Sequence, residues 1–186
     1  MWRFEHPLLV ASTASVGGGI GLRSWIVNAQ VPLDYGRCDL DAHVAELADA
    51  LGCEGEGVGL LTAAAMKVGA GSDGGVAAWA TVGVSKPTWA ADDEGAVSPW
   101  RPGTINVVLS LPVRLTDAAL LNLVVTATEA KTQALFEEGV PGTGTASDAV
   151  CVVCPPTGEA ERFAGPRSPW GARAARAVHA AVRARL

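Results

Sequence analysis

Six apolar runs along the chain have the length and bounding residues of β-strands. Glycine, proline or polar residues bound each run, which separates a short strand from a helix. The predicted strands cover residues 8–13, 24–31, 58–65, 76–84, 103–111 and 149–154. Gly17 to Gly19 and Gly21 lie between the first two runs and indicate a hairpin with a glycine-rich connection. The stretch from Met66 to Gly75 ends in Gly-Ser-Asp-Gly-Gly, so we predict a connection that ends in a turn.

Three other segments space their apolar residues as helices do. Residues 39–52 carry an apolar stripe on one side and end at Gly52, a typical residue after a helix. A second helix is predicted from Thr116, a good N-cap, to about Glu138. It is apolar on nearly every side as far as Thr126, which predicts a buried central helix. A final helix is expected over residues 170–186.

The predicted order of elements is β-β-α-β-β-β-α-β-α. Strands that follow one another directly favour antiparallel pairing, whereas strands separated by a helix favour parallel pairing. A chain of 186 residues is also of a size that forms one hydrophobic core. We therefore predict an α/β fold in which residues 1–186 form a single-domain sandwich, with a mixed β-sheet covered by helices.

Charge and hydropathy narrow the range of partners. The formal net charge is −5, so the chain exerts no long-range attraction on nucleic acid. No apolar stretch is long enough to predict a membrane span, and the start of the sequence lacks the pattern of a signal peptide. These features favour a cytoplasmic protein that binds neither nucleic acid nor a membrane.

Cys151 and Cys154 form a C-x-x-C pair inside the apolar run AVCVVC. Such a pair supplies half of a zinc site, but no second pair or His-x-His stands elsewhere in the sequence. We therefore favour two core residues of a strand over a metal site, and we assign no metal ligands.

Residues 86–103 form a proline-containing segment with two tryptophans, Trp89 and Trp100. Long irregular segments in compact domains are often lids or binding loops. Indole rings there either line a large flat ligand or pin the loop to the core. We take Trp100 as a candidate ligand contact and keep both interpretations.

Glu129 and Lys131 are the only charged residues between Asp117 and Glu137. Burial of either charge is costly unless the charge is paired or used in chemistry. Two residues along a regular helix correspond to a rotation of ~200°, so these two side chains point away from each other. An ion-pair role within the core is the alternative to a catalytic one.

Several short segments together resemble the adenosylcobinamide amidohydrolases. GTIN at 103–106, TEAK at 128–131 and TGTASD at 143–148 carry most of this similarity, and SWIVNAQV at 24–31 adds a weaker match. The resemblance implies cleavage of the aminopropanol amide of adenosylcobinamide to give adenosylcobyric acid, a step of corrinoid salvage for cobalamin biosynthesis. It implies a small-molecule substrate, a corrinoid, as the partner. It implies no cofactor, because the cobalt is carried by the substrate. A homo-oligomer is compatible with it.

The chemistry of amide hydrolysis suggests roles for residues in these segments. Glu129 and Asp148 are candidate general bases, and Lys131 and Asn106 are candidate donors to the oxyanion. We expect the remaining polar groups to position water or substrate, or to attack the amide directly, with Thr145 as the first alternative nucleophile. The residues assigned to catalysis are Glu129, Lys131 and Asp148. The residues assigned to substrate binding are Thr104, Asn106, Thr143, Thr145, Asn28 and Trp100.

Two other functions fit the same residues. A carrier would hold the corrinoid between the tryptophan loop and the GTIN strand without cutting it, since polar groups at strand ends suit binding as well as catalysis. An amidase of the same fold would act on an amide outside the corrinoids.

Overall fold

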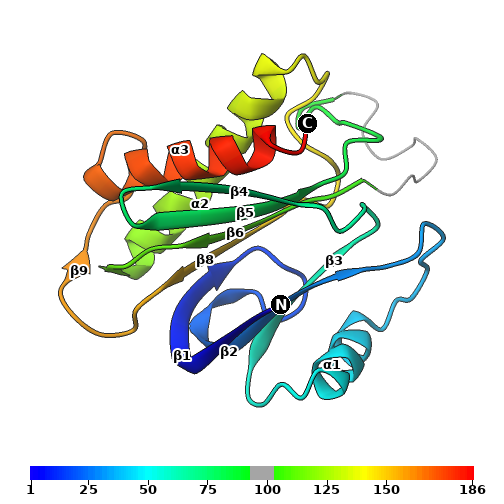
Figure 1. Cartoon of the computed structure of the whole chain (residues 1–186), viewed down its shortest axis with the longest axis horizontal. Coiled ribbons are helices and arrows are strands. Elements are labelled where there is room, and N and C mark those ends of the chain that lie inside the picture. Colours follow the sequence, from blue (N-terminus) through cyan, green and yellow to red (C-terminus); the bar gives the residue numbers. More distant parts are fainter. Residues whose placement is uncertain (93–102) are drawn as a thin grey trace.

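The computed structural model describes residues 1–92 and 103–186 of the chain. In these residues a seven-stranded sheet is strongly curved, and helices pack on its outer face. Figure 1 shows α2 and α3 lying side by side above one half of the sheet, with α1 beside the other half. The fold is therefore an α/β sandwich, as the sequence predicts.

The described residues form nine strands and three helices. The strands are β1 (Trp2–Ser12), β2 (Gly19–Gln30), β3 (Gly57–Thr62), β4 (Val68–Asp73), β5 (Val76–Val82), β6 (Ile105–Ser110), β7 (Arg114–Leu115), β8 (Ala149–Cys154) and β9 (Ala160–Glu161). The helices are α1 (Leu40–Ala50), α2 (Asp117–Glu137) and α3 (Pro169–Arg183).

The strand order is β3-β2-β1-β8-β6-β5-β4, and β7 and β9 form a small separate pair. β2 pairs with β3, and β6 with β8, in parallel, whereas the other neighbours in the large sheet are antiparallel. A helix connects the strands of each of these parallel pairs, since α1 precedes β3 and α2 precedes β8. The sheet is therefore mixed, as expected.

The sheet curls until strands that are not neighbours in it touch across its concave face. Asn28 of β2 donates a hydrogen bond to Thr81 of β5 at 3.0 Å. Asn106 of β6 donates to the carbonyl oxygen of Leu61 in β3 at 3.2 Å. The register of β1 shifts between Arg3 and Leu8, and an irregularity of this kind bends a strand. The concave face is consequently an interior that is partly enclosed by the sheet itself.

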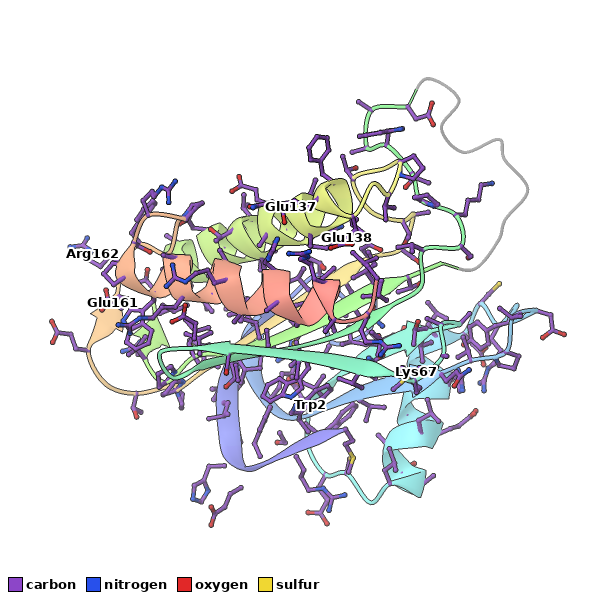
Figure 2. The ribbon with its side chains drawn as sticks, turned by 45° about the horizontal axis from the view of Figure 1, so that its top comes forward. Trp2, Lys67, Glu137, Glu138, Glu161 and Arg162 are labelled. Carbon is purple, nitrogen blue, oxygen red and sulfur yellow. The ribbon has the colours of Figure 1, made fainter. Side chains whose placement is uncertain are left out.

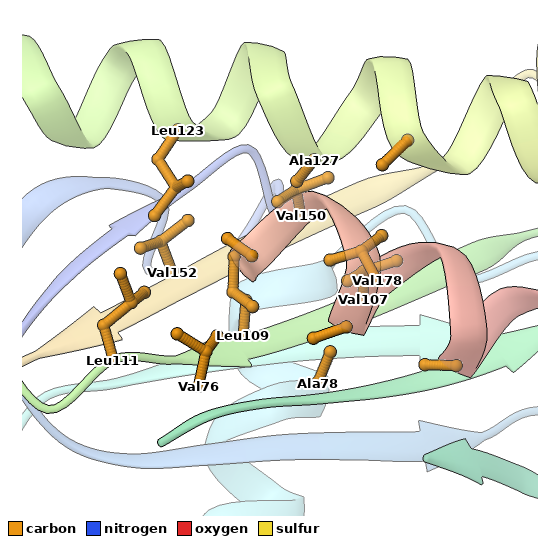
Figure 3. Close-up of a cluster of buried hydrophobic side chains, with 14 of the residues drawn as sticks. Val76, Ala78, Val107, Leu109, Leu111, Leu123, Ala127, Val150, Val152 and Val178 are labelled. Carbon is orange, nitrogen blue, oxygen red and sulfur yellow. The ribbon is translucent and has the colours of Figure 1, made fainter. Parts of the chain in front are cut away.

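The larger core lies between the sheet and helices α2 and α3. Figure 3 shows Leu123 and Ala127 of α2 above Val150 and Val152 of β8. All of these side chains are buried, and alanines on the underside of α2 allow the helix to lie close to the strands.

The outer side of α2 differs from the prediction of a helix buried all round. Leu121, Val125 and Phe136 are exposed, Phe136 with 75% of its surface. The apolar composition of this helix therefore does not mean complete burial, because one side of it faces away from the sheet.

The stretch from Met66 to Gly75 contains strand β4, so the prediction of a mere connection was wrong. Glycine is rare in strands, so the two glycines of this segment did not indicate a strand. The two glycines inside β4 let α3 approach its backbone, because a Cβ atom on Gly69 would lie 2.1 Å from the carbonyl oxygen of Ala181. A Cβ atom on Gly71 would lie 2.1 Å from the carbonyl oxygen of Ala177.

Cys151 and Cys154 are both buried in β8, in agreement with the interpretation as core residues. Cys151 faces the concave interior, whereas Cys154 packs in the core beneath the helices. Burial raises the pKa of the Cys151 thiol to about 12. The two sulfur atoms point to opposite faces of the sheet, so they do not form a shared ligand pair.

Ion pairs join the last turn of α2 to α3 at the surface. Glu137 accepts a hydrogen bond from His179 at 2.8 Å, and Glu138 accepts one from Arg183 at 2.7 Å. Figure 2 places both glutamates at the end of α2 next to α3. Hydrogen bonds from Gln133 and His179 hold the pKa of Glu137 below its usual value. Within the described ranges, the helices are too short or too polar to span a membrane.

Replacement of Gly69 by alanine tests the close approach of β4 and α3. We expect Gly69→Ala to lower the free energy of unfolding by about 1–3 kcal/mol, because the added methyl group meets the backbone of α3. Urea denaturation measures this change. The control is Ser72→Ala at an exposed position of the same strand, for which a change within about 0.5 kcal/mol is expected. Equal losses in both variants would contradict this account of the glycines.

Candidate active site

A cavity of about 570 Å³ opens at the edge of the concave interior. Its walls come from the β1–β2 connection, the end of β3, the segment before α1, and the starts of β6 and β8. Polar side chains gather on the walls that β6 and β8 provide. The polar residues there are Thr104, Asn106, Ser147 and Asp148.

The GTIN segment supplies one wall as the alternation of its residues predicts. Thr104 and Asn106 both line the cavity, whereas Ile105 packs in the core beneath α2. Gly103 also lines the cavity, and a Cβ atom there would lie 2.9 Å from the carbonyl oxygen of Gly83. Glycine at position 103 therefore allows the chain before β6 to lie close to the chain that follows β5.

Lys131 reaches from α2 to Asp148, which directly precedes β8. The Lys131 Nζ to Asp148 Oδ2 distance is 2.5 Å. The lysine side chain is 6% exposed and the aspartate side chain 13%, so both charges are nearly removed from water. Burial of two charges is costly unless they are paired and hydrogen-bonded, and this pair meets both conditions.

The Asp148 carboxylate accepts four hydrogen bonds: from Lys131 Nζ, the backbone N–H of Ile105, and the N–H and hydroxyl of Thr145. Four donors occupy about all the lone-pair positions that a carboxylate offers. Gly144 allows this crowding, because a Cβ atom on it would lie 2.3 Å from Asp148 Oδ2. The carboxylate therefore ties α2, the TGTASD turn and β6 together.

The Thr145 hydroxyl lies against this carboxylate. Its oxygen is 2.5 Å from Asp148 Oδ1 and 2.8 Å from the carbonyl oxygen of Gly103. Next to it, the hydroxyls of Ser147 and Thr104 are 2.7 Å apart, and Ser147 is also 3.2 Å from the Gly103 carbonyl oxygen. The Thr145 hydroxyl has one hydrogen for two acceptors, and the shorter distance and the negative charge favour donation to Asp148. A hydroxyl of the TGTASD turn thus has a basic partner that the sequence did not reveal.

Two backbone N–H groups of the same turn lack an acceptor among the described residues. In the part of the chain that the structure describes, the N–H groups of Ala146 and Ser147 donate no hydrogen bond. Both residues line the cavity directly after Thr145. Adjacent free N–H groups in a turn form a site for negative charge.

The structure separates some predicted site residues from this cluster. Glu129 is exposed on α2 and does not line the cavity, because α2 is unbroken and turns Lys131 inward instead. Thr143 accepts a hydrogen bond from the N–H of Ala90 at 3.0 Å, so its hydroxyl holds the neighbouring loop. Trp100 lies outside the described residues. Asn28 belongs to a buried network with Asn106 behind the cavity wall.

Ser147 and Tyr35 are among the cavity residues that sequence reasoning missed. Ser147 stands inside TGTASD, at a position that the motif leaves unspecified, so its place in the motif was the available signal. Tyr35 lines the cavity from the segment before α1, and its hydroxyl lies 2.6 Å from Nδ1 of His43. Burial is the largest cause that raises the Tyr35 pKa. No apolar or polar pattern distinguishes Tyr35 from a loop residue.

Comparison with known proteins gives the same assignment along the whole chain. The sequence model of the family described as adenosylcobinamide amidohydrolase matches residues 1–186. A protein of Methanosarcina mazei with that name is 32% identical over 188 residues, which cover 95% of this chain and 89% of the relative. Another, from Halobacterium salinarum, is 44% identical over 119 residues, which cover 61% of this chain and about half of that relative (51%). No solved structure matches significantly.

These matches place the chain among the amidohydrolases, hydrolases that act on an amide bond. Within that class, the chain belongs to the adenosylcobinamide amidohydrolase family. The resemblance to this family that the sequence indicates is thereby confirmed.

A double-mutant cycle on Lys131 and Asp148 tests the buried ion pair. We expect Lys131→Met to lower the free energy of unfolding by about 3–5 kcal/mol, because it leaves the carboxylate buried without its counter-charge. In the double variant with Asp148→Asn, we expect a loss smaller than the sum of the single losses by about 0.5–3 kcal/mol. Lys67→Met, at the exposed lysine labelled in Figure 2, is the control and should change stability by less than about 0.5 kcal/mol. Additive losses would show that the two charges do not interact.

Proposed function

We propose that the protein hydrolyses the amide that joins aminopropanol to adenosylcobinamide, giving adenosylcobyric acid and free aminopropanol. This reaction returns an incomplete corrinoid to cobalamin synthesis. The observation that carries the proposal is the contact of the Thr145 hydroxyl with the carboxylate of Asp148. Asp148 lines the cavity next to Ala146 and Ser147, whose N–H groups bond to no acceptor among the described residues, whereas Thr145 itself lies directly behind this wall. These are the parts that amide cleavage through a nucleophile requires.

The size of the cavity sets how the substrate binds. A cavity of about 570 Å³ is typical of sites for drug-sized molecules, and an adenosylated corrinoid is far larger than those. We therefore place only the amide and its aminopropanol group in the cavity. The macrocycle then rests outside, against the mouth.

Thr145 acts as the nucleophile in this proposal. Asp148 takes the hydroxyl proton while Thr145 Oγ1 forms a bond to the amide carbon, and the N–H groups of Ala146 and Ser147 stabilise the oxyanion. Asp148 then gives the proton to the amide nitrogen, and the C–N bond breaks to release aminopropanol. Lys131 holds the carboxylate in place throughout.

Water completes the cycle. A water molecule gives a proton to Asp148, and its oxygen adds to the ester that Thr145 has formed. The ester C–O bond then breaks, the proton returns to Thr145, and adenosylcobyric acid leaves. Direct attack by water on the amide is less well supported, because four donors occupy that carboxylate before the reaction. Once Thr145 has formed the ester, its hydroxyl no longer bonds to Asp148, and the water can take its place.

Incubation with adenosylcobinamide and mass spectrometry of the products test the reaction. We expect release of aminopropanol together with adenosylcobyric acid. Tight binding without cleavage would instead support a carrier of corrinoids. Neither binding nor cleavage would mean that the substrate is an amide of another class.

Thr145→Val tests the nucleophile. Valine has nearly the shape of threonine but no hydroxyl, so we expect kcat to fall by at least about 10³-fold with little change in substrate binding. Thr128→Val makes the same substitution at an exposed hydroxyl on α2 and should leave kcat unchanged.

Glu129→Gln separates the two candidate carboxylates. Because Glu129 is exposed away from the cavity, we expect this variant to keep a near-normal rate. A large loss in Glu129→Gln together with a normal rate in Thr145→Val would transfer the role of base to Glu129 and exclude the threonine mechanism.

A further inference from the structure

A buried polar network crosses the concave interior behind the cavity. Asn106 is 2% exposed and Asn28 is 9% exposed, yet both are polar. Their side chains bond to each other and to groups on β3 and β5. Polar groups in such a place are costly unless each finds a partner, so the direction of every bond matters.

The Leu61 carbonyl oxygen fixes the direction of this network. A backbone carbonyl only accepts, so the Asn106 atom 3.2 Å from it is the amide nitrogen. The same nitrogen lies 3.0 Å from Asn28, which must present its oxygen. The Asn28 nitrogen therefore turns to the Thr81 hydroxyl, at 3.0 Å.

Asn106 has two amide hydrogens, and both are used in these bonds. It therefore has no hydrogen left for an oxyanion and presents an acceptor oxygen, Oδ1. No donor among residues 1–92 and 103–186 bonds to this oxygen. In the same residues, every fully buried side-chain nitrogen and oxygen has a partner. Asn106 Oδ1 must consequently be reached from the cavity that Asn106 lines.

We propose that Asn106 Oδ1 accepts the N–H of the scissile amide, so that the site selects N–H-bearing amides over esters of the same shape. The inference rests on the proposed function, because it assigns a partner to the bond that is cut. An ester places an oxygen where the amide has its N–H, and two acceptors then face each other without a proton. A site built to bond a substrate N–H discriminates strongly against the analogue that lacks it.

Asn28 acts as a positioning residue in this scheme. Its oxygen holds one hydrogen of Asn106, and its own nitrogen is held by Thr81. The network spans β2, β5 and β6, so the acceptor in the cavity is oriented by strands on both sides of the concave face.

The test compares two ligands: adenosylcobinamide and the analogue in which an ester oxygen replaces the amide nitrogen. Equilibrium binding is measured with the Thr145→Val protein, so that cleavage does not consume either ligand. We expect the amide to bind roughly 10- to 100-fold more tightly than the ester. The macrocycle is the same in both ligands, so its contacts cancel in the ratio.

Two further variants locate the source of this ratio. In Asn106→Leu with Thr145→Val, the ratio should fall to about one, because the acceptor is gone. Ser110→Ala is the matched control on the same face of β6, outside the cavity, and should keep the ratio. If Asn106→Leu does not fold, a ratio near one in Thr145→Val alone still overturns the inference.

Each outcome has a distinct meaning. A ratio near one in Thr145→Val would overturn the role of Asn106 and leave the proposed hydrolysis intact. A ratio that persists in Asn106→Leu would assign the selectivity to another group and overturn the inference as well. If neither ligand binds, the proposed function fails, and this inference fails with it.

Discussion

The buried ion pair between Lys131 and Asp148 is the constraint on which the site depends. Each charge is removed from water, so neither partner is tolerated without the other and without further hydrogen bonds. To satisfy Asp148, the TGTASD turn must fold back on itself, β6 must begin beside it, and α2 must pass within reach. Three segments of the chain are thereby fixed in one arrangement, and the hydroxyl of Thr145 is fixed with them.

The curvature of the sheet creates the cavity beside this arrangement. A flat sheet would leave Asn28 and Asn106 on one exposed surface. Because the sheet curls, they meet groups on opposite strands and become interior residues. The site therefore combines two polar clusters with different tasks: one built around a charge pair at the wall, and one built from neutral amides behind it. The first prepares a nucleophile, and the second determines the direction of an acceptor.

Much of the fold and of the candidate site could be predicted from the sequence, and the features that could not be predicted have physical reasons. Thr116 and Gly139 mark the ends of α2 because capping is local, and GTIN alternates faces because strand geometry is regular. Strand β4 was not recognised because its glycines are explained only by close packing against α3, which lies more than 100 residues later in the sequence. The pairing of Lys131 with Asp148, and the bond between Asp148 and Thr145, depend on how α2 lies over β8. Helical spacing alone placed Glu129 and Lys131 on different sides but did not tell which side faced the site.

The pairing of β1 with β8 has a consequence for how the protein is made. Leu9 to Ser12 lie beside Cys151 to Cys154, and Thr13 accepts a hydrogen bond from the N–H of Val150, although about 140 residues separate these segments. Contacts of such long range form slowly, because a large loop must close first. During synthesis, β1 leaves the ribosome before its neighbour β8 has been translated. The cavity, which includes the start of β8 in its wall, therefore forms only after β8 has been synthesised, and the nascent chain carries an incomplete sheet until then.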